Sequence, residues 1–184
     1  MPKTESGKPA AEVAAARTIT PSDANDRVHI IRLRGPWEYR VLAVDASTAS
    51  PPDATQATLP AGRIPMPAEW GQPLGADFHG RVEYTRGFNR PTGLAAGQRV
   101  ELVLAGLDAF GSATFNQQPL GEIPPGGAVA RFNIGPLLLD RNTLVVEVEL
   151  PRSDERADCV TLRPAGREHL PGGLYGEVRL EIRE

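Results

Sequence analysis

The stretch HLPGGLYGEVRLEI, residues 169–182, has the pattern of a tight turn followed by a strand. Its Pro171-Gly172-Gly173 turn supplies backbone angles that a side chain would forbid, so the chain can turn tightly beside a neighbour. Apolar and charged residues then alternate, which is typical of a strand with one face on a core and one in water. Val178, Leu180 and Ile182 are predicted to face the core, and Glu177, Arg179, Glu181 and Arg183 to face water. The C-terminal segment is therefore predicted to lie in a sheet.

The composition favours a single all-β globular domain. The chain has 184 residues with 19 glycines and 18 prolines, and its apolar segments are short and separated by turn residues. Such a pattern predicts a β-sandwich or barrel rather than a helical fold. The predicted strands cover residues 28–34, 37–44, 80–88, 99–105, 112–116, 120–123, 130–134, 142–150 and 178–182. Residues 28–184 form the predicted sandwich, residues 1–27 a flexible arm, and residues 46–62 a long loop.

Charge and cysteine content exclude several classes of protein. The net charge is −3 without a basic block, which argues against a nucleic-acid footprint. No stretch is apolar enough to span a bilayer, and the polar N-terminus does not resemble a secretory signal. The single cysteine, Cys159, rules out an intrachain disulfide and a zinc-type cysteine cluster. A cytoplasmic location is therefore expected.

Six segments at ordered positions carry a family resemblance. They are residues 64–70, 80–88, 104–109, 114–121, 141–146 and 172–180. Together they resemble the N-terminal sugar-binding jelly roll of family 2 glycoside hydrolases, the β-galactosidase and β-glucuronidase family. The resemblance implies a galactose-binding-like β-sandwich. One departure lies in the hairpin, which has Asn116-Gln117-Gln118 where the family pattern has Asn-Gly.

The resemblance also implies a function without catalysis. In the family, both catalytic carboxylates lie on a separate barrel domain of about 250 residues, so this chain is expected to be no enzyme and to need no cofactor. A carbohydrate-binding or accessory role is implied, with a glycan or a glycoside hydrolase as partner. A structural or protein-interaction sandwich that has lost sugar binding is the alternative, and the oligomeric state stays open.

Four residues are candidates for ligand contact. Trp70 has a flat ring that could stack on a sugar, or it could fill the edge of the sandwich. Tyr175 could present its hydroxyl at the end of the sandwich, or pack in the core. Glu168 and His169 could hydrogen-bond sugar hydroxyls, or be solvated loop residues. In relatives the same loop often carries an acidic residue near the sugar, for which Glu168 and Asp158 are the nearest matches.

No metal site is expected from the local spacing of residues, so one could form only if residues distant in the sequence converge in space. The aspartates are scattered singly, without the regular spacing of a calcium loop. The histidines (His29, His79 and His169) show no pairwise spacing typical of zinc ligands.

Overall fold

The computed structural model describes residues 28–45, 59–152 and 163–184. The predicted arm, most of the predicted 46–62 loop, and Asp158 lie outside these residues. The strands are β1 (Val28–Arg32), β2 (Trp37–Val44), β3 (Ala61–Ile64), β4 (Ala68–Glu69), β5 (Gly80–Asn89), β6 (Arg99–Ala105), β7 (Phe110–Phe115), β8 (Gln118–Ile123), β9 (Val129–Asn133), β10 (Arg141–Leu150), β11 (Gly173–Leu174) and β12 (Val178–Arg183). A short helix α1 (Gly71–Leu74) and a 3-10 turn η1 (Gly135–Leu137) complete the elements.

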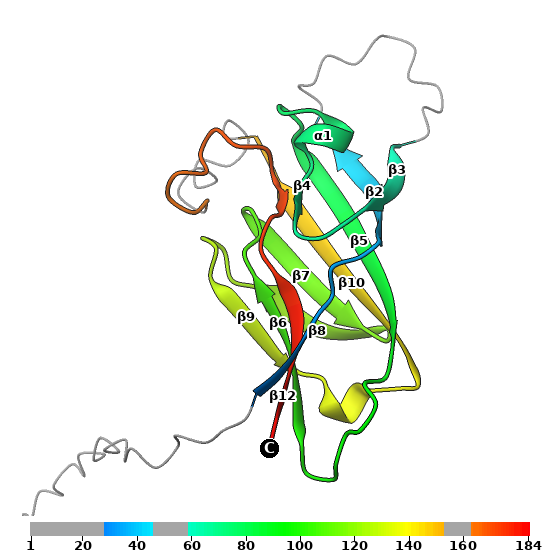
Figure 1. Ribbon diagram of the computed structural model, residues 1–184. Coiled ribbons are helices and arrows are strands. Elements are labelled where there is room, and N and C mark those ends of the chain that lie inside the picture. The colour runs from blue at the N-terminus through cyan, green and yellow to red at the C-terminus, as the bar shows by residue number, and fades with distance from the viewer. Residues whose placement is uncertain (1–27, 46–58, 153–162) are drawn as a thin grey trace, which may run out of the picture.

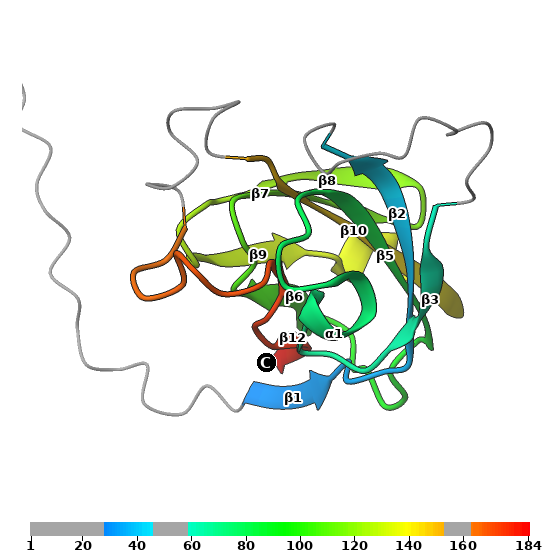
Figure 2. The ribbon, with the colours of Figure 1, turned by 90° about the horizontal axis from the view of Figure 1, so that it is seen from above.

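Two antiparallel sheets form the two layers of a sandwich (Figures 1 and 2). One has four strands in the order β1-β12-β6-β9, and the other has six in the order β3-β2-β5-β10-β7-β8. A small β11-β4 pair and helix α1 lie at one end of the sandwich (Figure 1). The predicted all-β sandwich is confirmed. No helix among the described residues is long and apolar enough to cross a membrane.

The C-terminal strand lies inside its sheet, as the sequence of residues 169–182 predicts. β12 pairs with β1 on one side and with β6 on the other. Its three predicted core residues, Val178, Leu180 and Ile182, are buried. Glu181, however, is only 3% exposed although the alternation placed it in water. It does lie on the outer face, but arginine side chains from β9 and from β12 itself cover it.

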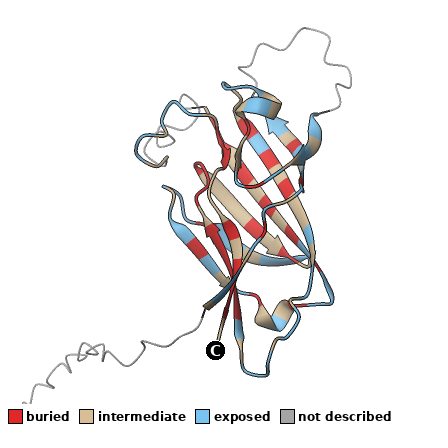
Figure 3. Ribbon diagram, in the orientation of Figure 1, coloured by how far each residue is buried: buried red, intermediate tan, exposed pale blue. Residues whose placement is uncertain are grey.

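The core lies between the two sheets and is formed by the inward residues of their strands (Figure 3). On β6 and β12 the outward residues Glu101, Val103 and Glu181 are buried as well. In β10 the buried residues are Asn142, Leu144, Val146, Val148 and Leu150, whereas Val145 is half-buried on the opposite face. This is the two-residue period of a strand with one face on a core. The parity predicted for β10 is therefore confirmed.

Replacing Val146 by alanine should cost about 1–3 kcal/mol of unfolding free energy, because lost apolar burial is followed by incomplete collapse of the cavity. The Val145→Ala variant should cost clearly less, since its side chain is only half-buried. Urea unfolding of the two variants measures the difference. Equal losses would contradict the assignment of the core face.

The β7–β8 hairpin turns without a glycine at its tip. Asn116 and Gln117 both have positive φ, at 49° and 66°, the combination required by a type I′ turn. Asn116 is held there by its side chain, whose Nδ2 donates to the Leu137 carbonyl at 2.8 Å and whose Oδ1 accepts from the Thr143 N–H at 2.8 Å. These bonds compensate for the missing glycine, because asparagine tolerates the left-handed region better than most residues.

Candidate functional site

The predicted stacking residue Trp70 is covered by its neighbours. It is 1% exposed and meets the edge of Phe78 at a centroid distance of 5.3 Å. Its ring also lies directly on Gly172, where an added Cβ atom would be 2.0 Å from the indole. The Nε1 atom is buried without a hydrogen-bond partner in the described structure. Trp70 therefore closes the end of the sandwich and presents no open ring face.

Tyr175 is also held by its surroundings. The guanidinium of Arg167 stacks on its ring at 3.7 Å from the centroid, a geometry that favours a cation–π interaction. Gly106 and Gly127 lie so close that a Cβ atom on either would be 2.7 Å from the tyrosine. Burial, together with the nearby Asp108 charge, raises the pKa of the Tyr175 hydroxyl. The phenol thus remains neutral and packed at physiological pH.

Asp108 is the buried carboxylate to which two arginines bind at this end of the sandwich. It is fully buried and accepts hydrogen bonds from Arg163 Nη2 at 3.3 Å and from Arg167 Nη2 at 3.0 Å. Arg167 also pairs with Glu69 at 2.8 Å. A buried carboxylate is tolerated only when it is paired and hydrogen-bonded. Sequence reasoning missed this cluster because the arginines follow Asp108 by more than fifty residues and no local spacing connects them.

Glu168 and His169 are exposed on the turn that precedes Pro171. The Glu168 carboxylate accepts from the Gly166 N–H at 3.0 Å. Hydrogen bonds from the backbone N–H groups of Glu168 and Gly166 lower the pKa of this carboxyl. Arg163 donates to the Glu168 carbonyl at 3.1 Å. The structure thus brings the four predicted residues to one end of the sandwich, with two filling it and two on its rim.

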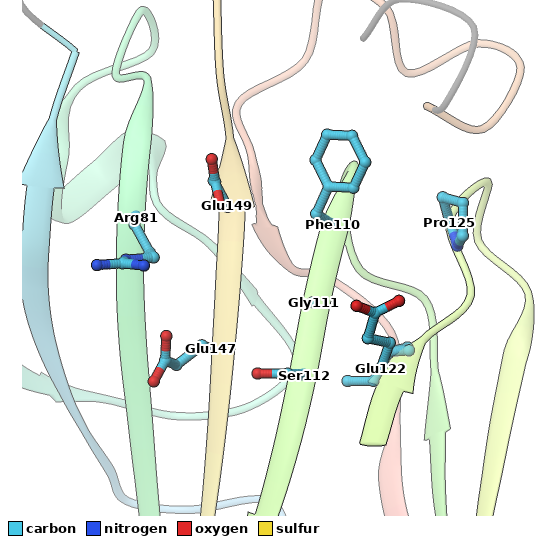
Figure 4. Close-up of a pocket in the computed structure, with 9 residues that line it drawn as sticks. Arg81, Phe110, Gly111, Ser112, Glu122, Pro125, Glu147 and Glu149 are labelled. Atoms are coloured by element: carbon cyan, nitrogen blue, oxygen red, sulfur yellow. The ribbon is translucent and has the colours of Figure 1, made fainter. Parts of the chain in front are cut away.

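A cavity of about 420 Å³ lies elsewhere, on the outer face of the six-stranded sheet (Figure 4). It is lined by Arg81, Phe110, Gly111, Ser112, Glu122, Ile123, Pro125, Glu147 and Glu149. The strand registers place Ser112 between Glu147 and Glu122, and Glu149 between Arg81 and Phe110. Two adjacent rows of side chains across β5, β10, β7 and β8 therefore form most of the lining.

The polar groups that line this cavity are able to hydrogen-bond hydroxyl groups. Carboxylates accept hydrogen bonds, Arg81 donates them, and the Ser112 hydroxyl does both. Phe110 supplies the aromatic ring. Glu147 lies directly opposite Glu83, whose carboxylate is neutralised by Arg40 at 2.9 Å. In the described part of the chain no ion pair neutralises Glu147, so its carboxylate is available to accept from a ligand.

Sequence reasoning did not find this cavity. Alternation alone places Glu147, Ser112 and Arg81 on outward faces, but it does not say which strands are neighbours. Within the described residues, no group of three or more His, Cys, Asp or Glu side chains is placed to hold a metal ion.

No protein-family model and no curated protein sequence matches the chain. Several solved glycoside hydrolases resemble it in structure. The FMN-binding β-glucuronidase of Faecalibacterium prausnitzii L2-6 is 23% identical with a TM-score of 0.63, over 86% of this chain and 23% of that one. Bifidobacterium dentium β-glucuronidase is 23% identical with a TM-score of 0.60, over 88% and 31% of the two chains. A GH2 β-galacturonidase from Eisenbergiella tayi is 18% identical with a TM-score of 0.59, over 87% and 25%.

These likenesses confirm the predicted resemblance at the level of the fold. The chain has the fold of one part of these glycoside hydrolases and spans less than a third of their length.

Proposed function

We propose that this chain is a non-catalytic carbohydrate-binding domain whose ligand site is the cavity on the outer face of the six-stranded sheet. The observation that carries the proposal is the lining itself, which combines charged and hydroxyl groups with the side chain of Phe110. Small-molecule sites combine an apolar surface with a few convergent polar groups in this way. The fold shared with enzymes named for sugar substrates supports the same class of ligand.

The negative charge of the cavity should favour neutral sugars over acidic ones. Glu122 and Glu147 outnumber Arg81 among the lining residues, so a uronate would meet like charges. Neutral glycans, whose hydroxyls donate to carboxylates, fit better. Affinity should be weak, because each protein–sugar hydrogen bond replaces a bond to water at a net gain of about 1 kcal/mol.

The second candidate is an accessory or protein-interaction sandwich, acting for example beside a glycoside hydrolase. Its support is the filled end of the sandwich, where Trp70 and Tyr175 are covered by the chain itself. In that case Glu168 and His169, on the rim, would be contacts for a protein partner rather than for a sugar.

A matched pair of hydroxyl deletions tests the cavity. Ser112 and Thr114 lie two residues apart on the outward face of β7, and only Ser112 lines the cavity. The Ser112→Ala variant should weaken binding of a galactoside or a neutral plant oligosaccharide about fivefold, the loss of one hydrogen bond. Thr114→Val should leave binding unchanged. Isothermal titration calorimetry measures both.

Two further outcomes separate the candidate functions. If Glu168→Ala with His169→Ala abolishes binding while Ser112→Ala does not, the ligand lies at the loop end and the cavity assignment is wrong. If no glycan in the panel produces heat with the wild type, the interaction-module candidate replaces carbohydrate binding.

A further inference from the structure

The outer face of the four-stranded sheet carries a ladder of charged side chains, called here the arginine face. It consists of Arg32 on β1, Arg99 and Glu101 on β6, Arg131 on β9, Glu177 just before β12, and Arg179, Glu181 and Arg183 on β12. Five guanidinium groups thus face three carboxylates, which leaves the ladder with two more positive than negative charges. The whole chain, in contrast, carries a net charge of −3.

The carboxylates of the ladder are enclosed by arginines. Glu181 contacts Arg131 at 2.7 Å, Arg179 at 2.8 Å and Arg183 at 2.7 Å. The hydrogen bond from Arg131 is the main cause that lowers the pKa of Glu181 to about 2. The pKa of Glu177 is likewise lowered, chiefly by Arg32. Both glutamates therefore stay ionised at neutral pH, and the balance of charge on the face persists.

The outermost guanidinium groups retain donors for a ligand. Arg99 is 60% exposed at its side chain and contacts one carboxylate, Glu101, through Nη2 at 2.9 Å. Arg32 is 49% exposed and contacts Glu177 through Nε at 2.6 Å. A guanidinium has five N–H donors in a planar fork. Most of the fork at each of these two arginines is therefore left for solvent or for a partner.

We propose that the arginine face binds an anionic glycan that carries carboxylate groups, such as a chain of uronic acid residues. The charge of the face is complementary to such a polymer. Its own geometry shows that it accommodates carboxylates, since three already lie among its arginines. Guanidinium forks match carboxylates in two-point contacts. Charged side chains on four neighbouring strands also offer an extended chain repeated contacts along its length.

A nucleic acid fits this surface less well. Proteins that bind single strands stack bases on aromatic side chains. The outward positions on this sheet, among the residues that the structure describes, hold Val28, Ile30, Val103, Val129 and Asn133 beside the ladder, and no aromatic ring. The arginine face lies on the opposite layer from the cavity, so its ligand can be tested independently of the proposed function.

The test compares two charge-matched double variants of the full chain with an oligogalacturonate of defined length. Arg32→Gln with Arg99→Gln removes two exposed charges from the arginine face. Arg40→Gln with Arg63→Gln removes two exposed charges of similarly paired arginines from the six-stranded sheet. Binding should weaken at least about tenfold in the first variant, from lost charge-assisted hydrogen bonds, and less than about twofold in the second.

A second comparison tests the chemistry of the ligand. The same oligomer with its carboxylates reduced to alcohols should not bind, and added salt should weaken binding of the oligogalacturonate. Equal binding of the reduced oligomer, equal losses in the two double variants, or equal or tighter binding of a single-stranded DNA of matched length would each overturn the proposal. Absence of oligogalacturonate binding by the wild type at low salt would also overturn it.

Discussion

Replacing Gly176 by alanine is expected to disrupt the sandwich. A Cβ atom on Gly176 would lie 1.0 Å from the carbonyl oxygen of Ala105 and 2.9 Å from the Cα of Gly106. The Gly176 N–H donates to the Gly106 carbonyl at 2.9 Å, so the two backbones meet directly. Because both sides of the clash are backbone, no change of rotamer can relieve it. The start of β12 would have to separate from β6.

The expected loss of unfolding free energy exceeds the roughly 1–3 kcal/mol typical of overpacking by a side chain. It is a large share of the approximately 5–15 kcal/mol by which domains are stable. Urea unfolding measures it, and poor recovery of soluble protein would agree with it. The matched control is Gly87→Ala in β5, where the nearest atom to an added Cβ lies 3.9 Å away. Comparable stability of both variants would show that β12 does not approach β6 this closely.

Replacing Asp108 by asparagine, a nearly isosteric change, should strongly lower the stability of the fold. The shape of the side chain is kept, but Arg163 and Arg167 lose their shared buried charge. Removing one partner of a buried ion pair typically costs about 3–5 kcal/mol, because the remaining charge is left buried and uncompensated. Thermal and urea unfolding at neutral pH should show this loss. The exposed Asp140 provides the control, and Asp140→Asn should change stability by less than about 0.5 kcal/mol.

A second measurement locates the damage caused by Asp108→Asn. Arg163 holds the 163–171 turn through the carbonyls of Glu168 and Leu170, at 3.1 and 2.7 Å. Without Asp108 these arginines lose their anchor, and the turn should become the first site cut by a protease under native conditions. If the variant is destabilised but the turn stays resistant, then Asp108 supports the core through another contact, such as its proximity to Tyr84.

The local pattern of the sequence was sufficient to predict a β-sandwich and to predict which side chains of a strand face the core. A strand turns successive side chains to opposite faces, so alternation alone identified the core residues of β10 and β12. The same reasoning identified the β7–β8 hairpin, although Gln117 stands where a glycine is usual. The ordered motifs added the family resemblance that the solved structures bear out as a shared fold.

The tertiary structure alone decided which outward residues meet. The strand order within each sheet is not the order in the chain, so Arg81 and Glu147 come to lie beside the β7–β8 hairpin that carries Ser112 and Glu122 only through long-range pairing. Alternation correctly placed Glu181 on the outer face but predicted it to be solvated. Of the arginines that cover it, Arg131 comes from β9, which lies beyond β6 in the sheet. Asp108 is likewise paired with Arg163 and Arg167, which follow it by more than fifty residues in the sequence. Charges with no periodicity in sequence are paired by the fold, because a buried carboxylate is stable only where the chain brings it a cation.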